Sequence, residues 1–259
     1  MKDWDIQINY GIKTGCNEAF IISSEKKDEL INTDPKSAEI IRPILRGRDI
    51  KRYGYEFADL YLIATFPSKH YNIDDYPAVR DYLLAFGKER LEQTGKTYNV
   101  NGEMIKARKK TNNKWFETQD SISYWEDFSK QKIIYPNMTK YLPFVFDDKG
   151  FLTNQKCFIL TGKKIAFLTA FFNSSLFKFC YRDNFPELLG GTRELSKIFF
   201  DKISVLQIND KIEQEFYKLV TDIQKDYSKE KAMQIDRKIF NLYGLSQEEQ
   251  ELIGYIEIK

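Results

Sequence analysis

Residues 165–181 read IAFLTAFFNSSLFKFCY and form the longest apolar run in the chain. Asn173, Ser174, Ser175 and Lys178 interrupt this run, whereas a membrane span needs about 20 predominantly apolar residues. The run therefore predicts a helix that is buried in a protein core. Such a helix must pack against another layer of secondary structure, so the sequence around it decides the fold.

Strand signals lie on both sides of this run. The apolar segments that predict strands are 60–66, 132–135, 144–146, 157–160 and 203–208. Residues 4–23 predict a strand, a glycine turn and a short strand over 19–22, and residues 147–150 (DDKG) have the composition of a hairpin turn. Because few helices separate these strands, we expect an α/β (α+β) fold in which a twisted mixed or antiparallel sheet packs on helices.

The other segments predict helices and one long loop. Asp34-Pro35 predicts a short helix over 36–41 that Pro43 ends, and Pro77 begins a helix that Gly95 stops. Residues 96–118 lose all periodicity, which predicts a long irregular loop. After residue 208 apolar residues recur at helical spacing, and Ser246 with Glu249 forms a capping box. The sequence thus predicts a domain over 1–208 and a helical tail over 209–259 that docks on this domain or on a partner domain.

Composition excludes several classes of protein. The chain has a single histidine, His70, and three widely spaced cysteines, Cys16, Cys157 and Cys180. A structural zinc site takes four such ligands at suitable spacing, so we do not expect one. The absence of a disulfide framework and of an apolar signal segment indicates a cytoplasmic protein with no membrane partner.

Three short strings come near to catalytic motifs without completing them. Residues 184–187 (NFPE) depart at two positions from the Asn-Pro-Pro-aromatic loop by which adenine methyltransferases hold a flipped base. Residues 25–27 (EKK) and 257–259 (EIK) match only the short half of a Mg²⁺-dependent nuclease motif. Residues 161–164 (TGKK) lack the upstream glycine of a phosphate loop. We therefore expect no catalytic residue, cofactor or metal in this chain.

The net charge of +2 does not indicate a nucleic-acid-binding protein, but one stretch is strongly basic. Between residues 96 and 116 the one acid, Glu103, is outnumbered by basic side chains. These are Lys96, Lys106, Arg108, Lys109, Lys110 and Lys114. Clustered positive charge is the footprint of a phosphate-binding surface, and a solvated basic loop is the alternative.

Several sequence blocks, in their order along the chain, resemble one family. Residues 10–21 (YGIKTGCNEAFI) are similar to the opening block of the TaqI-like C-terminal specificity domain. This is the target-recognition part of type IIG restriction-modification enzymes and related adenine-specific DNA methyltransferases. The later blocks that resemble the family are 36–53 (KSAEIIRPILRGRDIKRY), 125–136 (WEDFSKQKIIYP), 172–176 (FNSSL) and 190–208, which opens with GGTR. Residues 204–205 and 207–208 replace prolines that often close the last block.

The resemblance implies a domain that reads double-stranded DNA and carries no catalytic machinery. It implies a partner adenine N6-methyltransferase domain, with or without a nuclease domain, and S-adenosylmethionine and Mg²⁺ would belong to those partners. Three alternatives stay open: a specificity subunit that acts in trans as in type I systems, a standalone DNA-modifying enzyme with an unrecognised site, and a protein-interaction module that uses the tail.

A reader of duplex DNA needs cations for phosphates and amide, hydroxyl or guanidinium groups for base edges. In the basic stretch, we expect Lys109 and Lys110 to hold phosphates and Arg108, Asn112 and Asn113 to read bases. The further candidates for DNA contact are Lys96, Tyr98, Lys106 and Lys114 in the same stretch, Lys13, Thr14 and Asn17 at the glycine turn, and Thr139, Lys140 and Arg193.

Two of these loops also fit a structural role. At the glycine turn, turn chemistry is favoured slightly over phosphate binding. For Arg46 and Arg48 an internal ion pair with Asp49 is expected, because a loop aspartate beside two arginines usually pairs with them.

Overall fold

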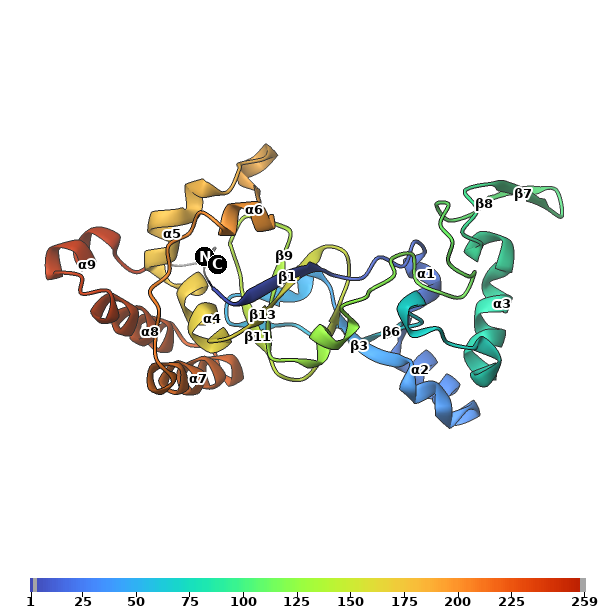
Figure 1. Cartoon of the computed structure of the whole chain (residues 1–259), viewed down its shortest axis with the longest axis horizontal. Coiled ribbons are helices and arrows are strands. Elements are labelled where there is room, and N and C mark those ends of the chain that lie inside the picture. The colour runs from blue at the N-terminus through green and yellow to red at the C-terminus, as the bar shows by residue number, and fades with distance from the viewer. Residues whose placement is uncertain (2–3, 257–259) are drawn as a thin grey trace. The chain divides into compact units, whose positions relative to one another are not determined.

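The structure is a computed structural model that describes residues 1 and 4–256 (Figure 1). The chain divides into two compact units, and each is described by itself. Unit 1 comprises Met1–Tyr10, Arg46–Glu56 and Asp127–Lys259, and unit 2 comprises Gly11–Leu45 and Phe57–Glu126. The EIK triplet at 257–259 lies outside the described residues, as do residues 2–3.

Unit 1 is built on a four-stranded antiparallel sheet in the order β1-β13-β9-β11. Its strands are β1 (Ile6–Tyr10), β9 (Lys132–Pro136), β11 (Val145–Asp147) and β13 (Cys157–Gly162). All five residues of β9 are buried, so this strand is covered on both faces. The sheet and the helices that pack with it confirm the expected fold class.

The long apolar run forms two helices, and the expectation of one continuous helix is corrected. These are α4 (Ile165–Asn173), in which every residue is buried, and α5 (Ser175–Tyr181). Ser174 between them has an extended backbone, and its hydroxyl accepts a hydrogen bond from the Phe177 amide. The chain therefore breaks at Ser174 because a serine cap begins a new helix there.

The polar residues of this run join three parts of unit 1. The Asn173 side chain pairs with both the amide and the carbonyl of Phe144. The Ser175 amide and hydroxyl both donate to the buried carboxylate of Asp236. Arg52 donates to the Asn173 carbonyl and lies 3.9 Å from Asp236. Burial raises the pKa of Asp236, although these hydrogen bonds and the nearby arginine oppose that rise.

The helical extension is present as expected, in α7 (Asp210–Lys225), α8 (Lys229–Leu242) and α9 (Gln247–Ile253). The Glu213 carboxylate accepts from the Ala166 and Phe167 amides, so α7 caps the first turn of α4. The capping box of Ser246 and Glu249 is confirmed. These helices share the core of unit 1, while a domain boundary at residue 208 stays a prediction.

Unit 2 has a smaller antiparallel sheet in the order β3-β6-β2. The strands are β2 (Ile21–Ser23), β3 (Ile41–Leu45) and β6 (Leu60–Ile63), and a separate hairpin is formed by β7 (Thr97–Val100) and β8 (Glu103–Lys106). The helices are α1 (Asn17–Phe20), α2 (Ser24–Thr33) and α3 (Pro77–Leu91). The strand expected over 60–66 is confirmed over 60–63, and the helix that begins at Pro77 is confirmed.

The remaining short elements of unit 1 are β4 (Ile50–Lys51), β5 (Gly54–Tyr55), β10 (Met138–Thr139), β12 (Leu152–Thr153), β14 (Arg193–Glu194) and α6 (Lys197–Phe200). Strand β4 pairs with β5, and β10 pairs with β14. Within the described residues, no helix is long and apolar enough to cross a membrane.

Four expectations for local structure are wrong. Residues 203–208 form no strand, because side chains such as Tyr181 and Tyr243 bond their backbone. The turn at 147–150 closes no hairpin, since β11 pairs with β9. The short helix expected over 36–41 is a 3₁₀ turn at Pro35–Glu39, and β3 continues through Pro43. The segment 19–22 is divided between α1 and β2.

We expect Asp236→Ala to lower the free energy of unfolding by about 3 kcal/mol, because it leaves the buried amide and hydroxyl of Ser175 without their acceptor and removes the carboxylate near Arg52. Chemical denaturation followed by circular dichroism measures this loss. The exposed Asp201 provides the matched control, and Asp201→Ala should change stability by less than about 0.5 kcal/mol. Equal effects of the two substitutions would contradict the role of Asp236.

Candidate nucleic-acid interface

Arg108 organises the basic stretch of unit 2 from inside the protein. Its side chain is buried, with 5% of the residue exposed. Its guanidinium donates four hydrogen bonds to backbone carbonyls, over 2.6–2.8 Å, and the acceptors are Thr14, Leu91, Trp115 and Glu117. Burial lowers the pKa of Arg108 to about 10, so the group stays a cation at neutral pH. The expected base-reading role of Arg108 is therefore corrected, because its donors are used within unit 2.

The buried amide of Gln93 is a second anchor for the same segment. It donates to the carbonyls of Lys114, Glu117 and Thr118, and it accepts from the Thr111 hydroxyl at 2.8 Å. The Asn113 side chain also donates to the Thr118 and Gln119 carbonyls, so its amide nitrogen is occupied as well. The segment 108–118 is therefore fixed by hydrogen bonds from the side chains of Gln93, Arg108 and Asn113, and it is not a loosely attached loop.

The first part of the basic stretch is the β7–β8 hairpin, whereas the sequence analysis expected an irregular loop. Asn101 and Gly102 form its turn with positive φ angles of 51° and 89°. This Asn-Gly pair is the strongest short-range hairpin signal, so the sequence contained the information. Tyr98 is half-buried and its hydroxyl lies 3.0 Å from that of Thr94, which leaves only part of its ring for the DNA contact that we expected.

The lysines of this stretch point outward. Lys96, Lys106, Lys109 and Lys110 are exposed, and among the described residues none of the four has an acidic partner within 4.0 Å. Lys114 is exposed too and lies over the Phe116 ring. Asn112 is exposed between two anchored neighbours. Their roles in binding stay predictions, but the structure leaves all of them accessible.

The glycine turn of unit 2 is explained by the burial of Arg108. Gly15 has a φ of +76°, and a Cβ atom there would lie 2.9 Å from Arg108 Cδ and 2.5 Å from Gln119 Oε1. The Thr14 hydroxyl donates to Asn17 Oδ1 and accepts from the Cys16 amide. Thr14 is buried, so a contact with phosphate through its side chain is corrected, while Lys13 and Asn17 stay candidates.

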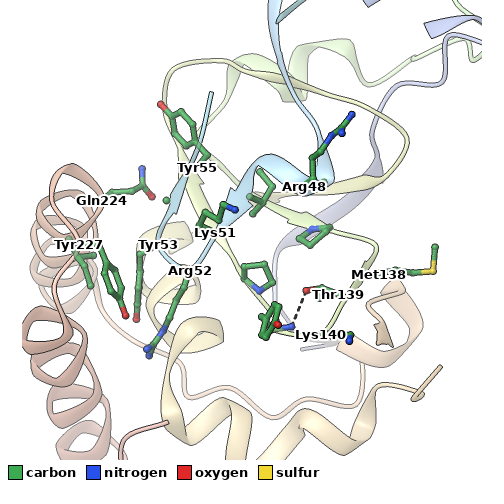
Figure 2. Close-up of a pocket in the computed structure, with 17 residues that line it drawn as sticks. Arg48, Lys51, Arg52, Tyr53, Tyr55, Met138, Thr139, Lys140, Gln224 and Tyr227 are labelled. Carbon is green, nitrogen blue, oxygen red and sulfur yellow. Dashed lines mark hydrogen bonds between the residues drawn. The ribbon is translucent and has the colours of Figure 1, made fainter. Parts of the chain in front are cut away.

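The remaining candidates for DNA contact lie in unit 1, where one of them is buried and two line a groove. Arg193 is buried and donates to the Arg182 and Phe185 carbonyls and to Glu187, so its expected contact with DNA is corrected to a structural role. Thr139 and Lys140 instead line a groove of about 700 Å³. Figure 2 shows these two residues on one segment and Arg48 and Lys51 on another segment that lines the same groove.

Arg48 is a surface residue, although its sequence pattern predicted an internal ion pair. The expected internal ion pair forms between Arg46 and Asp49 by two hydrogen bonds of 2.8 and 3.0 Å. Arg48 takes no part in it and is exposed. The signal was the short spacing of the Arg-Gly-Arg-Asp turn, in which one carboxylate pairs with one guanidinium by two hydrogen bonds and leaves the second arginine without this partner.

We expect Arg108→Ala to destabilise unit 2 by about 3 kcal/mol or more, because four backbone carbonyls lose a charged donor in a buried place. Amide hydrogen exchange should show faster exchange in residues 11–45 and 57–126 than in unit 1. Lys109→Ala, next to it but exposed, is the control and should leave exchange unchanged. A stable Arg108→Ala variant with altered sequence choice would return Arg108 to the interface.

Comparisons with known proteins agree with this architecture. The structure is similar to that of a type IIL restriction-modification enzyme, MmeI, solved in complex with DNA, with a TM-score of 0.60 and 13% identity over 93% of this chain. It is also similar to the type IIG restriction endonuclease BpuSI, with a TM-score of 0.51 and 13% identity over 85% of this chain. The chain spans only 33% and 25% of those two proteins. A family model for the TaqI-like C-terminal specificity domain matches residues 42–205, more than half of the sequence, and the chain therefore belongs to that family.

Proposed function

We propose that this chain is the DNA target-recognition domain of a restriction-modification enzyme. The observation that carries the proposal is the set of exposed lysines on a segment that Arg108 and Gln93 hold in place. Ammonium groups bind phosphates without preference for sequence and fix the register of the protein on the duplex, so that neighbouring amide groups can read base edges. Membership in a specificity-domain family and the DNA-bound relative support the same function.

In this proposal the chain binds DNA and a partner domain supplies the chemistry. The partner is an adenine N6-methyltransferase domain that uses S-adenosylmethionine, with or without a Mg²⁺-dependent nuclease domain. The recognition domain would contribute by fixing the position of the duplex, because an error of about 1 Å in the reacting geometry is costly to the rate.

Replacing Lys109 and Lys110 together by alanine should weaken binding to duplexes of any sequence. For each phosphate that the variant no longer binds, the slope of log affinity against log salt should fall by roughly one unit, because fewer counterions are released. Fluorescence anisotropy with a labelled random-sequence duplex, titrated at several salt concentrations, measures both effects.

The matched control is Lys26 and Lys27, two consecutive lysines elsewhere in unit 2. Lys26 already pairs with Glu29 and Lys27 with Asp28, so their replacement by alanine should leave the salt slope unchanged. If the Lys109 and Lys110 double variant kept both the affinity and the slope of the wild type, the basic stretch would not be the phosphate-binding surface.

Asn112→Ala should instead relax the choice of sequence. An exposed amide can bond two atoms of an adenine edge, and losing such a pair costs about 1–3 kcal/mol of discrimination. Selection from a randomised duplex pool, with wild type and variant compared by sequencing, measures the change. Asn17→Ala, at the glycine turn of the same unit, shows whether the effect is confined to the basic stretch. Identical selected sequences for wild type and Asn112→Ala would exclude Asn112 as a reader.

A further inference from the structure

The groove in unit 1 has features that the proposed contacts of unit 2 do not use. Its volume of about 700 Å³ is that of a small-molecule pocket and far below the size of a double helix. Three segments supply the walls: residues 47–55, residues 136–143 and the end of α7 around Gln224 and Tyr227. Figure 2 shows Lys51 and Thr139 on opposite sides of the space that these segments enclose.

The charged side chains that line the groove are all cations. They are Arg48, Lys51, Arg52 and Lys140, and none of the lining residues is an aspartate or glutamate. Two of the four are already engaged, because Arg52 donates to the Asn173 carbonyl and Lys51 lies 3.4 Å from Glu56. Arg48 and Lys140 are exposed, and within the described residues neither has an acidic partner within 4.0 Å.

The position of Arg48 follows from the turn that carries it. Asp49 accepts from the amide and the side chain of Arg46, which closes the turn and leaves Arg48 at its tip. A Cβ atom on Gly47 would lie 3.1 Å from the Lys156 carbonyl, so the glycine lets this turn lie close to its neighbour. The guanidinium is therefore presented from a fixed backbone.

Aromatic rings complete the groove. Tyr141 and Tyr227 line the groove and are 53% and 49% exposed, so about half of each residue is accessible to a ligand. Pro136, Pro143 and the buried Tyr53 add an apolar lining between them. Exposed aromatic rings bind nucleobases by stacking, and adjacent cations bind the phosphate of the same nucleotide.

We infer that this groove binds a single nucleotide, with Arg48 and Lys140 on its phosphate and Tyr141 and Tyr227 beside its base. A paired duplex would present only its phosphates here and would leave the aromatic walls empty, whereas an unpaired nucleotide uses both. The inference rests on the proposed DNA-recognition function for one of its two sources: the nucleotide is either an unpaired residue of a DNA strand or a free mononucleotide.

The test uses the full chain and three probes: a fully paired duplex, the same duplex with one unpaired 2-aminopurine nucleotide, and free dAMP. We expect the unpaired probe to bind roughly tenfold tighter than the paired one, as expected for one stacked base. The fluorescence of its 2-aminopurine should fall on binding. Competition by dAMP alone, with no preference for the unpaired probe, would identify a free mononucleotide as the source.

Two double variants separate charge from stacking. The first replaces both cations (Arg48→Ala with Lys140→Ala), and the second removes both rings (Tyr141→Ala with Tyr227→Ala). Each should abolish whichever the wild type shows, the preference for the unpaired probe or the competition by dAMP. The conservative pair Tyr141→Phe and Tyr227→Phe keeps both rings and should retain it. Lys202→Ala is the control for charge, because Lys202 is exposed in unit 1 and lies outside the groove. All four groove residues named here are exposed or lie at loop positions, and denaturation midpoints verify that each variant folds.

The outcomes distinguish this inference from the proposed function. A wild type that binds paired duplex through Lys109 and Lys110 but has neither a preference for the unpaired probe nor competition by dAMP overturns the nucleotide site alone. A wild type that binds no duplex contradicts the proposed function, and dAMP binding that depends on Arg48 would still support the groove. Retention of the preference in both alanine double variants would also overturn the inference.

Discussion

The burial of the Arg108 guanidinium is the constraint on which unit 2 depends. A buried cation is tolerated only when its donors are bonded, and here four carbonyls from three separate segments of the chain provide the acceptors. Those carbonyls fix the end of α3, the glycine turn and the loop up to residue 117 in one arrangement. Gly15 must be a glycine because the arginine side chain fills the space that a Cβ would need. Lys109 and Lys110 follow Arg108 directly in the chain. Because the Arg108 side chain occupies the buried site, the two lysine side chains lie in solvent.

In unit 1 side chains also hydrogen-bond the backbone, and here amide side chains pair with backbone groups as a neighbouring strand would. Asn173 satisfies both hydrogen-bonding groups of Phe144, and Gln224 of α7 does the same for Phe146 on the edge strand β11. An edge strand with free backbone groups invites pairing with another chain, so the amide of Gln224 also protects this edge. Lys132 and Asp147 form a buried pair, and the carboxylate also accepts from the Phe151 amide. Asn173 and Lys132 lie in sequence blocks that resemble the family, whereas their partners Phe144 and Asp147 lie outside those blocks.

The sequence predicted the parts of the fold that depend on local pattern. The buried run at 165–181, the strand at 132–135 and the capping box at Ser246 required only periodicity and capping chemistry. It did not predict which polar residues are buried, because an arginine in a basic stretch has the same local pattern whether it faces water or four distant carbonyls. Arg108 and Arg193 were assigned to DNA for this reason. The strand expected over 203–208 failed similarly, since tertiary contacts and not a neighbouring strand satisfy its backbone.

The basic residues that were expected to contact DNA fall into buried ones, which hold the fold together, and exposed or half-buried ones, which stay candidates for DNA contact. Arginine is suited to burial because its planar group bonds several carbonyls at once, whereas lysine keeps its charge in water at the end of a flexible stem. In the basic stretch of unit 2 the one arginine, Arg108, is buried and the lysines are exposed. Arg48 departs from that division, because it is an exposed arginine on a turn whose carboxylate is already used by Arg46. The backbone that carries Arg48 is fixed by this turn before any ligand binds, so no backbone entropy at this position need be lost when the side chain bonds a phosphate. Lys51 differs from Arg48 because its ammonium group already lies 3.4 Å from the carboxylate of Glu56. We therefore expect phosphate binding in the groove to depend more on Arg48 than on Lys51.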